Sequence, residues 1–583
     1  MVAVGVNLGA HLVRLFGIAV PAQVAAYQYF SSGGKLDAPS LATYAGAATV
    51  MGLSQWYGAS RAPKYTPEYT AHWASKQELE PMCLSLEDLQ SGIALGFGYK
   101  RITGIKPGLA NRKELGHALI VGPGRRGKGL HLMSTLFNWQ GSAVVVDIKG
   151  EMYDKTSEAR RRMDQNIIVL DPSGYGSRID PFAELQTNEG LRAACNLILK
   201  PELAGANAAF PRRASSLLFA MMRAALVQGV PVLPFVRDLT ALGMREACTN
   251  LEAVDDPYVQ QDLVDFLNER PSMVNWATAS SDKFLNNSWS NLTGALKPLM
   301  SDGILAMTSG RDLTALDLVT KPTTVYLRFS ESDLKYTAEA FQIVVMSLIN
   351  NLLRQFDADP NAGRIPCLFC FDEAGRIEVP GLPGLVSTVA GRGLSALIYI
   401  QSISQLVTTY GAAGASTIRD NCDAKVFFTP NDIETARYIS ELCGRLGVQD
   451  FRYSRSSENV GAGESHGVKD RDLITTEGVM SLKLGRIIAK YADYPPMVMH
   501  RLEPWLLPGG KAALKLQAQP LEKRVITPPP MRRGEVNGDA ADPKLRDALL
   551  RDLNKDAEPP SLPNEQTPDA PGKPNDDEEM DQE

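Results

Sequence analysis

Short apolar runs recur along the middle of the chain, and each ends at a glycine, an acid or an amide. The first ends at Val121, and the others open the segments SAVVVDIKGE (142–151), PCLFCFDEAG (366–375) and LSALIYIQSISQL (394–406). Uninterrupted apolar runs of this length are typical of parallel strands that are buried on both faces. The pattern predicts an α/β fold with a parallel-rich central sheet. Ligands of such sheets gather at the carboxyl ends of the strands.

Residues 186–316 follow a different pattern. Stretches such as SSLLFAMMRAALVQ and DLVDFLNERPSMVNW repeat their apolar positions at helical spacing and do not alternate as strands do. We therefore expect this part of the chain to be helical.

Two apolar segments near the start, residues 12–30 and 39–57, are long enough to cross the hydrocarbon core of a bilayer as helices. The second segment carries no charge, and a short polar turn separates the two. Arg14 and Arg61 make both outer ends basic, which favours the cytoplasmic side for each end. We predict a transmembrane helical hairpin within residues 1–60. A pair of buried or interfacial helices is the alternative, because the first segment is only mildly apolar.

The last part of the chain, residues 525–583, is rich in proline and acidic residues. It contains too little apolar surface to offset the entropy of ordering it, so we predict a disordered acidic tail. Such a tail is either a solvated spacer or a docking segment for a basic partner.

Composition adds few constraints. The 583 residues are 44% hydrophobic and 22% charged, which is ordinary for a globular protein of several domains. The net charge of -6 does not exclude nucleic acid, because an acidic tail can mask a basic channel. Seven cysteines in so long a chain argue against a disulfide scaffold and favour a reducing cytoplasm for the working domain.

The most informative motif follows the first apolar run. The spacing Gly122-x4-Gly127-Lys128 opens a helical pattern and forms a P-loop, whose backbone N–H groups cradle phosphates while the lysine reaches the β and γ phosphates. Gly129 stands where a serine or threonine usually contacts Mg²⁺, so either water, phosphate and carboxylates hold the metal or the site is weakened. We predict that ATP is bound by Gly122, Pro123, Gly124, Arg125, Arg126, Gly127, Lys128, Gly129 and Leu130.

Acidic residues end two of the predicted strands. Asp372 can ligate or polarise the Mg²⁺ shell, and Glu373 can orient and deprotonate the attacking water. An acidic pair after a strand can also cap a helix. Asp147, Lys149 and Glu151 follow the other strand, where they either face the nucleotide or form a charged turn.

Two further side chains complete the predicted catalytic set. Gln401 ends the third strand, where an amide can sense the γ-phosphate or position water. Arg392 lies in the loop AGRG before that strand. Its guanidinium either reaches a neighbouring subunit's phosphate as an arginine finger or is simply solvated.

This ordered set of motifs resembles the type IV secretion coupling proteins of the TraG kind, conjugative relatives of the FtsK and HerA motors. The resemblance covers most of residues 65–505, and glycine commonly follows the P-loop lysine in this family. The matching segments are YTAHWAS (69–75), GPGRRGKGLH, VVVDIKGEMYDKTSEARR (144–161), LDPSGYGSRIDPFAEL (170–185), FCFDEAGRI, AGRGLSALIYIQSISQL and NCDAKVFFTPNDIETARYIS (421–440).

The resemblance implies a RecA-like P-loop NTPase motor domain built from residues 61–185 and 317–524. An all-α domain, residues 186–316, is inserted between the two parts and is associated in the family with substrate engagement. Family members assemble as hexameric rings on a transmembrane stem, which implies a nucleotide site shared between subunits of a homohexamer.

The resemblance also implies a function. An inner-membrane coupling ATPase, with its motor in the cytoplasm, would use ATP and Mg²⁺ to deliver single-stranded DNA and its attached relaxase to the secretion channel. Arg160, Arg161, Arg162, Arg212 and Arg213 would then contact DNA phosphates, or belong to solvated helix faces. The alternative is a nucleotide-binding receptor platform that recruits protein effectors for type IV secretion without pumping DNA.

Overall fold

The computed structural model describes residues 70–185, 187–329, 334–360, 362–376, 378–379, 381–389, 391–454 and 463–524. The predicted membrane hairpin and the predicted acidic tail both lie outside these residues. Among the helices of the described part, none has the length and hydropathy needed to cross a membrane.

A 12-stranded mixed sheet runs through the body in the order β2-β1-β14-β13-β10-β3-β9-β8-β4-β7-β5-β6. From β10 to β5 every neighbouring pair is parallel, whereas both edges are antiparallel. The predicted parallel-rich sheet is therefore confirmed. Its strands are β1 Ile93–Gly98, β2 Arg101–Ile105, β3 Ala118–Val121, β4 Ser142–Asp147, β5 Asn166–Asp171, β6 Tyr175–Gly176, β7 Thr323–Arg328, β8 Cys367–Phe371, β9 Leu394–Ile400, β10 Ala424–Phe428, β13 Arg486–Tyr491 and β14 Met497–His500.

Both faces of the sheet are covered, which explains the uninterrupted apolar runs. Successive residues of β4 belong to different cores: Val145 packs on one face with α5 and α6, and Val144 packs on the other with α17 and α19. A strand buried on both sides needs apolar residues at every position. The helices around the sheet are α5 Lys128–Leu136, α6 Glu151–Arg161, α17 Leu334–Ala358, α18 Leu382–Thr388, α19 Ile403–Asn421 and α20 Ile433–Cys443.

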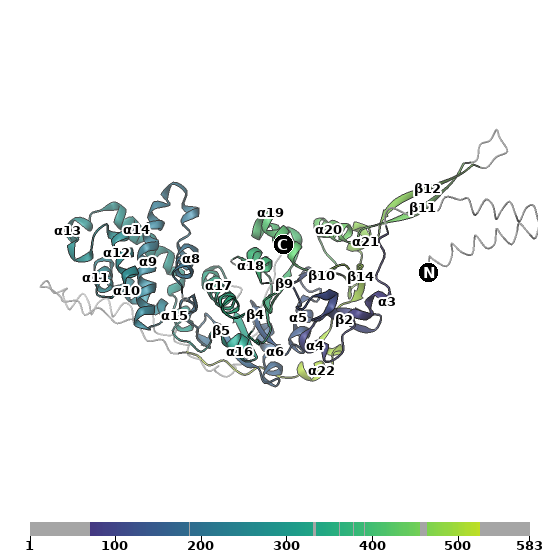
Figure 1. Ribbon diagram of the computed structural model, residues 1–583, viewed down its shortest axis with the longest axis horizontal. Coiled ribbons are helices and arrows are strands. Elements are labelled where there is room, and N and C mark those ends of the chain that lie inside the picture. The colour runs from purple at the N-terminus through teal and green to yellow at the C-terminus, as the bar shows by residue number, and fades with distance from the viewer. Residues whose placement is uncertain are drawn as a thin grey trace, which may run out of the picture.

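Between β6 and β7 every element that the structure describes is helical, as the apolar spacing indicates. Figure 1 shows α8 to α15 gathered at one end of the molecule, whereas α16 lies against β4 and β7 of the sheet. The long helix α9 lies among α8, α10, α12 and α14, and ten of its 20 residues are buried. The helices are α7 Pro181–Leu185, α8 Asn188–Leu199, η3 Pro201–Asn207, α9 Ala209–Gln228, α10 Val232–Leu242, α11 Met244–Glu252, α12 Pro257–Leu267, η4 Pro271–Met273, α13 Trp276–Ala279, α14 Lys283–Leu296, η5 Lys297–Met300, α15 Asp302–Met307 and α16 Asp317–Thr320.

At the opposite end, a two-stranded ribbon projects from the body (Figure 1). It pairs β11 Arg445–Ser454 with β12 Gly463–Asp472, and an antiparallel bridge joins its base to Thr70. Its first strand alternates apolar and polar residues only in two short stretches, Leu446 to Val448 and Phe451 to Tyr453, which are too short to predict a strand of this length. The remaining short helices are α3 Lys76–Leu79, η1 Glu80–Met82, α4 Asp88–Ser91, η2 Leu109–Asn111, α21 Thr476–Met480, η6 Pro504–Leu506 and α22 Gly510–Ala513.

The described chain ends in an extended segment, residues 515–524, that crosses the body from α22 to β6. The Tyr153 hydroxyl donates to the Gln519 carbonyl at 2.7 Å, and an antiparallel bridge pairs Tyr175 with Lys523. The described residues therefore end beside β6.

Candidate nucleotide site

The segment between β3 and α5 has the geometry of a phosphate-binding loop. Gly122 N–H donates to the Ile400 carbonyl at 3.1 Å, so the loop starts in register with β9. A Cβ on Gly122 would lie 2.6 Å from the Phe428 Cβ, which leaves room for glycine only. Gly127 precedes α5 with φ 119°, a conformation that favours glycine. Both predicted glycines are thus required by the backbone.

Lys128 begins α5 with its side chain only 6% exposed. Its Nζ donates to the Gly122 carbonyl at 2.6 Å and lies 3.9 Å from the Glu373 Oε1. Burial lowers the pKa of Lys128, and the carboxylates of Glu373 and Asp372 oppose that shift. The ammonium therefore lies at the mouth of the loop among the predicted catalytic carboxylates.

Asp372 and Glu373 follow β8 directly, next to the loop. Burial, aided by the charge of Glu373, raises the pKa of Asp372 to about 6, against the influence of Lys128. Glu373 is buried with φ 59°, which is unusual for a residue with a side chain, and Gln401 Nε2 donates to its Oε2 at 2.8 Å. The structure thus brings Lys128, Asp372, Glu373 and Gln401 together, as the sequence predicts.

Hydrogen bonds from β9 and α19 hold the turn that carries Glu373. Ala374 N–H donates to the Tyr399 carbonyl at 3.0 Å, and the Tyr410 hydroxyl donates to the Ala374 carbonyl at 3.0 Å. The Thr409 hydroxyl donates to the Gly375 carbonyl at 2.6 Å. Strained backbone persists where the surroundings fix it in this way, and it is typical of functional sites.

The surroundings of Gly129 bear on how Mg²⁺ is held. A Cβ there would meet only the Met152 Cε, at 3.6 Å, so nothing in the backbone requires glycine. No group of three or more histidine, cysteine, aspartate or glutamate side chains within the described residues is arranged to hold a metal. Asp372 is the carboxylate placed beside the loop, which fits a Mg²⁺ that keeps several waters and phosphate oxygens as ligands.

Because Asp372 is buried, its ionisation should reduce the stability of the folded protein. Raising its pKa from 3.8 to about 6 corresponds to a cost of about 3 kcal/mol for the ionised group at neutral pH. Because the folded carboxyl holds its proton more tightly, this cost appears as the pH rises through about 6. Asp372→Asn is expected to raise the melting temperature of the nucleotide-free protein at pH 8 more than at pH 5, as measured by thermal denaturation. The exposed Asp255→Asn is the control, and equal shifts at both pH values would refute the explanation.

Asp147 caps a helix. Its Oδ2 accepts the Tyr153 N–H at 2.8 Å at the start of α6, and burial raises its pKa to about 6. Lys149 is exposed, and Glu151 pairs with Lys155 on the helix surface at 3.9 Å. Of the two interpretations of this segment, the structure favours the charged turn, which leads into α6.

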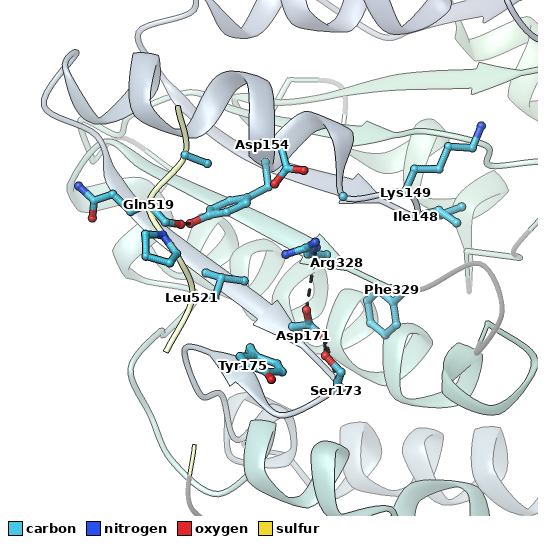
Figure 2. A pocket seen from close by; sticks show the side chains of 14 residues that line it. Ile148, Lys149, Asp154, Asp171, Ser173, Tyr175, Arg328, Phe329, Gln519 and Leu521 are labelled. Atoms are coloured by element: carbon cyan, nitrogen blue, oxygen red, sulfur yellow. Dashed lines mark hydrogen bonds and ion pairs between the residues drawn. The ribbon is translucent and has the colours of Figure 1, made fainter. Parts of the chain in front are cut away.

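A cavity of about 740 Å³ lies beside the start of α6, at the ends of β4, β5 and β7. Figure 2 shows Arg328 pointing at Asp171 inside it, while the Lys149 side chain extends away from that pair. The Arg328 Nε and the Asp171 Oδ2 are 4.0 Å apart. No residue of the loop or of the Asp372 turn lines this cavity, so it is separate from the nucleotide site.

Arg392 lies just before the start of β9, at the end of the strand opposite to the nucleotide site. Gly391 and Gly393 N–H donate to the Glu114 Oε2, and the Arg392 Nη2 lies 2.8 Å from the Asp357 Oδ1. The full length of β9 separates Arg392 from Gln401. The structure therefore does not bring Arg392 to the nucleotide site of its own chain.

The expectation that Arg160 contacts DNA phosphates is wrong. Its guanidinium is completely buried, where it donates to the Leu136 carbonyl at 3.1 Å and to the Gly141 carbonyl at 2.9 Å. Arg161 and Arg162 both pair with Glu158 on the exposed face of α6. Helical spacing gave no sign that the first of three consecutive arginines points inward.

Two features near the site have no sequence motif that predicts them. His131 on α5 and the Tyr399 hydroxyl on β9 are hydrogen-bonded at 2.9 Å, and burial lowers the pKa of His131 to about 4. Arg501, which follows β14, donates from Nη1 to the Arg126 carbonyl at 3.3 Å. The first contact joins α5 to β9, and the second joins the loop to the residue that follows β14.

The loop on β3, the acids on β8 and the amide after β9 lie at one edge of a parallel sheet, which places the chain among P-loop proteins with a RecA-like sheet. Residues 73–525 match the family model for Type IV secretory system Conjugative DNA transfer. The chain belongs to this family of conjugative DNA-transfer proteins.

Individual relatives agree with that assignment. Protein VirD4 of Rhizobium radiobacter is 26% identical over 466 residues, which are 76% of this chain and 64% of the relative. Conjugal transfer protein TraG of Escherichia coli is 24% identical over 390 residues, 59% of this chain and 58% of the relative. The chain thus spans less than two thirds of the length of these relatives.

A solved structure shares the fold. The bacterial conjugative coupling protein TrwBdeltaN70 superposes with a TM-score of 0.56 at 16% identity, covering 79% of this chain and 97% of that one. The plasmid coupling protein TrwB in complex with ADP and Mg²⁺ gives a TM-score of 0.54 at 16% identity, covering 75% of this chain and 95% of that one.

Proposed function

We propose that this chain is the coupling ATPase of a conjugative type IV secretion system. It binds ATP at the P-loop and uses hydrolysis to drive single-stranded DNA, with its attached relaxase, toward the secretion channel. The observation that carries the proposal is the set of contacts from Lys128 to Glu373 to Gln401 at the carboxyl edge of the sheet. Family membership supports the DNA-transfer role.

Each residue of the nucleotide site has its own role in ATP binding or hydrolysis. The N–H groups from Gly122 to Leu130 and the ammonium of Lys128 bind the phosphates. Glu373 accepts a proton from the attacking water, and the amide of Gln401 holds the Glu373 carboxylate in place. Asp372 would hold Mg²⁺ through an oxygen or a bound water, and that ion supplies charge neutralisation at the phosphates.

The proposal extends to assembly and location. Residues 1–60 anchor the protein in the inner membrane, and the motor formed by residues 61–185 and 317–524 assembles as a homohexamer in the cytoplasm. The all-α part, residues 186–316, engages the DNA–protein substrate, and residues 525–583 form an acidic tail.

In such a ring, Arg392 acts on the nucleotide of a neighbouring subunit. Its ion pair with Asp357 is partly exposed and therefore weak, so a phosphate can replace the carboxylate. Arg392→Ala is expected to lower the ATPase rate at least about tenfold. Co-assembling Arg392→Ala chains with Lys128→Ala chains should restore about a quarter of the wild-type rate, because some interfaces then carry both intact residues.

If mixing Arg392→Ala chains with Lys128→Ala chains restores no ATPase activity, Arg392 does not act on the nucleotide of a neighbouring subunit. The control is Arg311→Ala, an arginine whose side chain is 51% exposed and which lies by the helical region, away from the site.

The DNA-transfer role is tested by measuring ATP hydrolysis by the full-length protein with and without single-stranded DNA. We expect the DNA to bind and to raise the rate, and we expect added salt to weaken binding because phosphate contacts dominate it. Protein that hydrolyses ATP but neither binds nor responds to DNA would favour the receptor platform for protein effectors.

A further inference from the structure

The hydroxyl of Tyr410 lies at the backbone of the segment that follows Glu373. It donates to the Ala374 carbonyl at 3.0 Å and accepts the Val379 N–H at 3.0 Å. One hydroxyl thus joins two backbone groups on either side of a short segment. Burial raises the pKa of Tyr410 above its ordinary value, so the hydroxyl keeps its proton and can donate at neutral pH. The roles assigned so far to the nucleotide site leave this side chain without a function.

The Val379 end of this bridge is anchored to the body. Val379 is buried, and its carbonyl accepts the Leu382 N–H at 3.1 Å where α18 begins. The carbonyl of the preceding residue, Glu378, accepts a hydrogen bond from the Gln342 Nε2 of α17 at 3.1 Å. An anchored N–H gives the hydroxyl a fixed position from which it holds the Ala374 carbonyl.

Ala374 is the residue through which this hydroxyl acts on Glu373. The φ of Glu373 is 59°, a conformation that persists only when neighbouring groups hold it. The Ala374 N–H donates to the Tyr399 carbonyl at 3.0 Å, and the Ala374 carbonyl accepts the Tyr410 hydroxyl. The first contact comes from the main chain of β9, whereas the second depends on one side-chain oxygen. Removing that oxygen would release one side of Ala374 and leave the other side in place.

The stretch of chain before Tyr410 also holds the Glu373 carboxylate. Gln401, which precedes α19, donates from Nε2 to the Glu373 Oε2 at 2.8 Å. Gly375 packs so closely on α19 that a Cβ there would lie 2.5 Å from the Gln405 Cδ. The end of β9 and the first turns of α19 thus hold both the side chain and the backbone of the catalytic turn.

Lys128 is the other group that approaches this carboxylate, with its Nζ 3.9 Å from the Glu373 Oε1. In the proposed function the same ammonium binds the phosphates, so it is not a dedicated support for Glu373. The direction of the carboxylate then depends on Gln401 and on the backbone that carries it. Precise placement matters, because a misplacement of about 1 Å can lower a catalytic rate by about 10²-fold.

We propose that Tyr410 is a positioning residue for ATP hydrolysis, whose hydroxyl fixes the turn that directs the Glu373 carboxylate toward the attacking water. The inference rests on the proposed function, in which Glu373 is the base, and adds a residue to it. In this role Tyr410 touches neither ATP nor water, because it acts through the backbone of Ala374. Loss of the hydroxyl should therefore lower the rate of hydrolysis without weakening nucleotide binding.

ATPase kinetics and ADP titration of the full-length Tyr410→Phe variant test this inference. Phenylalanine keeps the ring and removes the hydroxyl, so we expect kcat to fall about tenfold while the KM for ATP and the affinity for ADP change by less than about twofold. A variant with the wild-type kcat would overturn the inference. An equal loss of kcat and ADP affinity would also overturn it, because a general loosening of the site would then explain both.

Tyr153→Phe is the matched control. It removes the hydroxyl of a buried tyrosine that donates to a backbone carbonyl, that of Gln519, at 2.7 Å, away from the nucleotide site. We expect this variant to turn over ATP like the wild type. A loss of kcat equal to that of Tyr410→Phe would show that any missing buried hydroxyl has this effect, and would overturn the specific role of Tyr410.

A double variant shows whether Tyr410 acts through Glu373. In the Glu373→Gln background the residual rate no longer depends on the carboxylate, so adding Tyr410→Phe should lower the single-turnover rate by less than about twofold. A further loss of about tenfold would mean that the two residues act independently, and would overturn the inference. A Glu373→Gln protein that hydrolyses ATP like the wild type would instead overturn the proposed function, on which this inference rests.

Discussion

Glu373→Gln is expected to reduce the ATPase rate by about 10³-fold while leaving nucleotide binding nearly intact. The substitution keeps the shape of the side chain, and its amide oxygen can still accept the hydrogen bond from Gln401. It removes the carboxylate that takes the proton from water. Steady-state hydrolysis and ADP titration of the same preparation measure the two effects separately.

Glu434→Gln is the matched control for that substitution. Glu434 lies on α20 at the protein surface and accepts a hydrogen bond from the Ser404 hydroxyl of α19 at 2.6 Å. We expect its variant to turn over ATP like the wild type. A Glu373→Gln protein that retains more than about a tenth of wild-type turnover would show that another group is the base.

Arg160→Met is expected to destabilise the protein by about 3 to 5 kcal/mol, because it removes a buried charge that several buried acceptors need. The guanidinium donates to the Thr324 hydroxyl at 2.8 Å and to the Gln165 Oε1 at 3.0 Å, and to the carbonyls of Leu136, Trp139 and Gly141. Burial lowers its pKa to about 10, so it stays charged at neutral pH. Methionine fills the space but leaves those acceptors unpaired.

Urea denaturation measures this loss, with Arg161→Met as the control on the same helix. Arg161 has one partner, Glu158, on a partly exposed surface, so its variant should change stability by less than about 1 kcal/mol. Similar losses for the two variants would refute the role assigned to Arg160. Leu136 is the last residue of α5, the helix that begins at Lys128, and Arg160 donates to its carbonyl. The Arg160 variant should therefore also weaken nucleotide binding.

The central sheet could be predicted from the sequence because the apolar run that marks a buried strand is a local feature of the chain. A strand buried on both faces, such as β4, must be apolar throughout, and the loop at Gly122 needs glycine where Phe428 approaches. Asp372, Glu373 and Gln401 could be placed beside Lys128 because neighbouring parallel strands end at one edge.

Other features depend on contacts between distant parts of the chain. Arg501 reaches the P-loop from a position more than three hundred residues later, and Arg160 turns inward only because five acceptors surround it. In the ribbon of β11 and β12 the alternation of apolar and polar residues is interrupted at Gln449 and Asp450, so no continuous hydrophobic pattern reveals its pairing. No local rule predicts contacts of these kinds.

The most direct test of the account is DNA transfer from donor cells in which Lys128→Ala replaces the wild-type protein at equal abundance. Transfer is expected to be lost, because the ammonium that binds the phosphates is removed and the motor cannot use ATP. Transfer at the wild-type frequency would contradict it, since the P-loop would then be dispensable for the function proposed here.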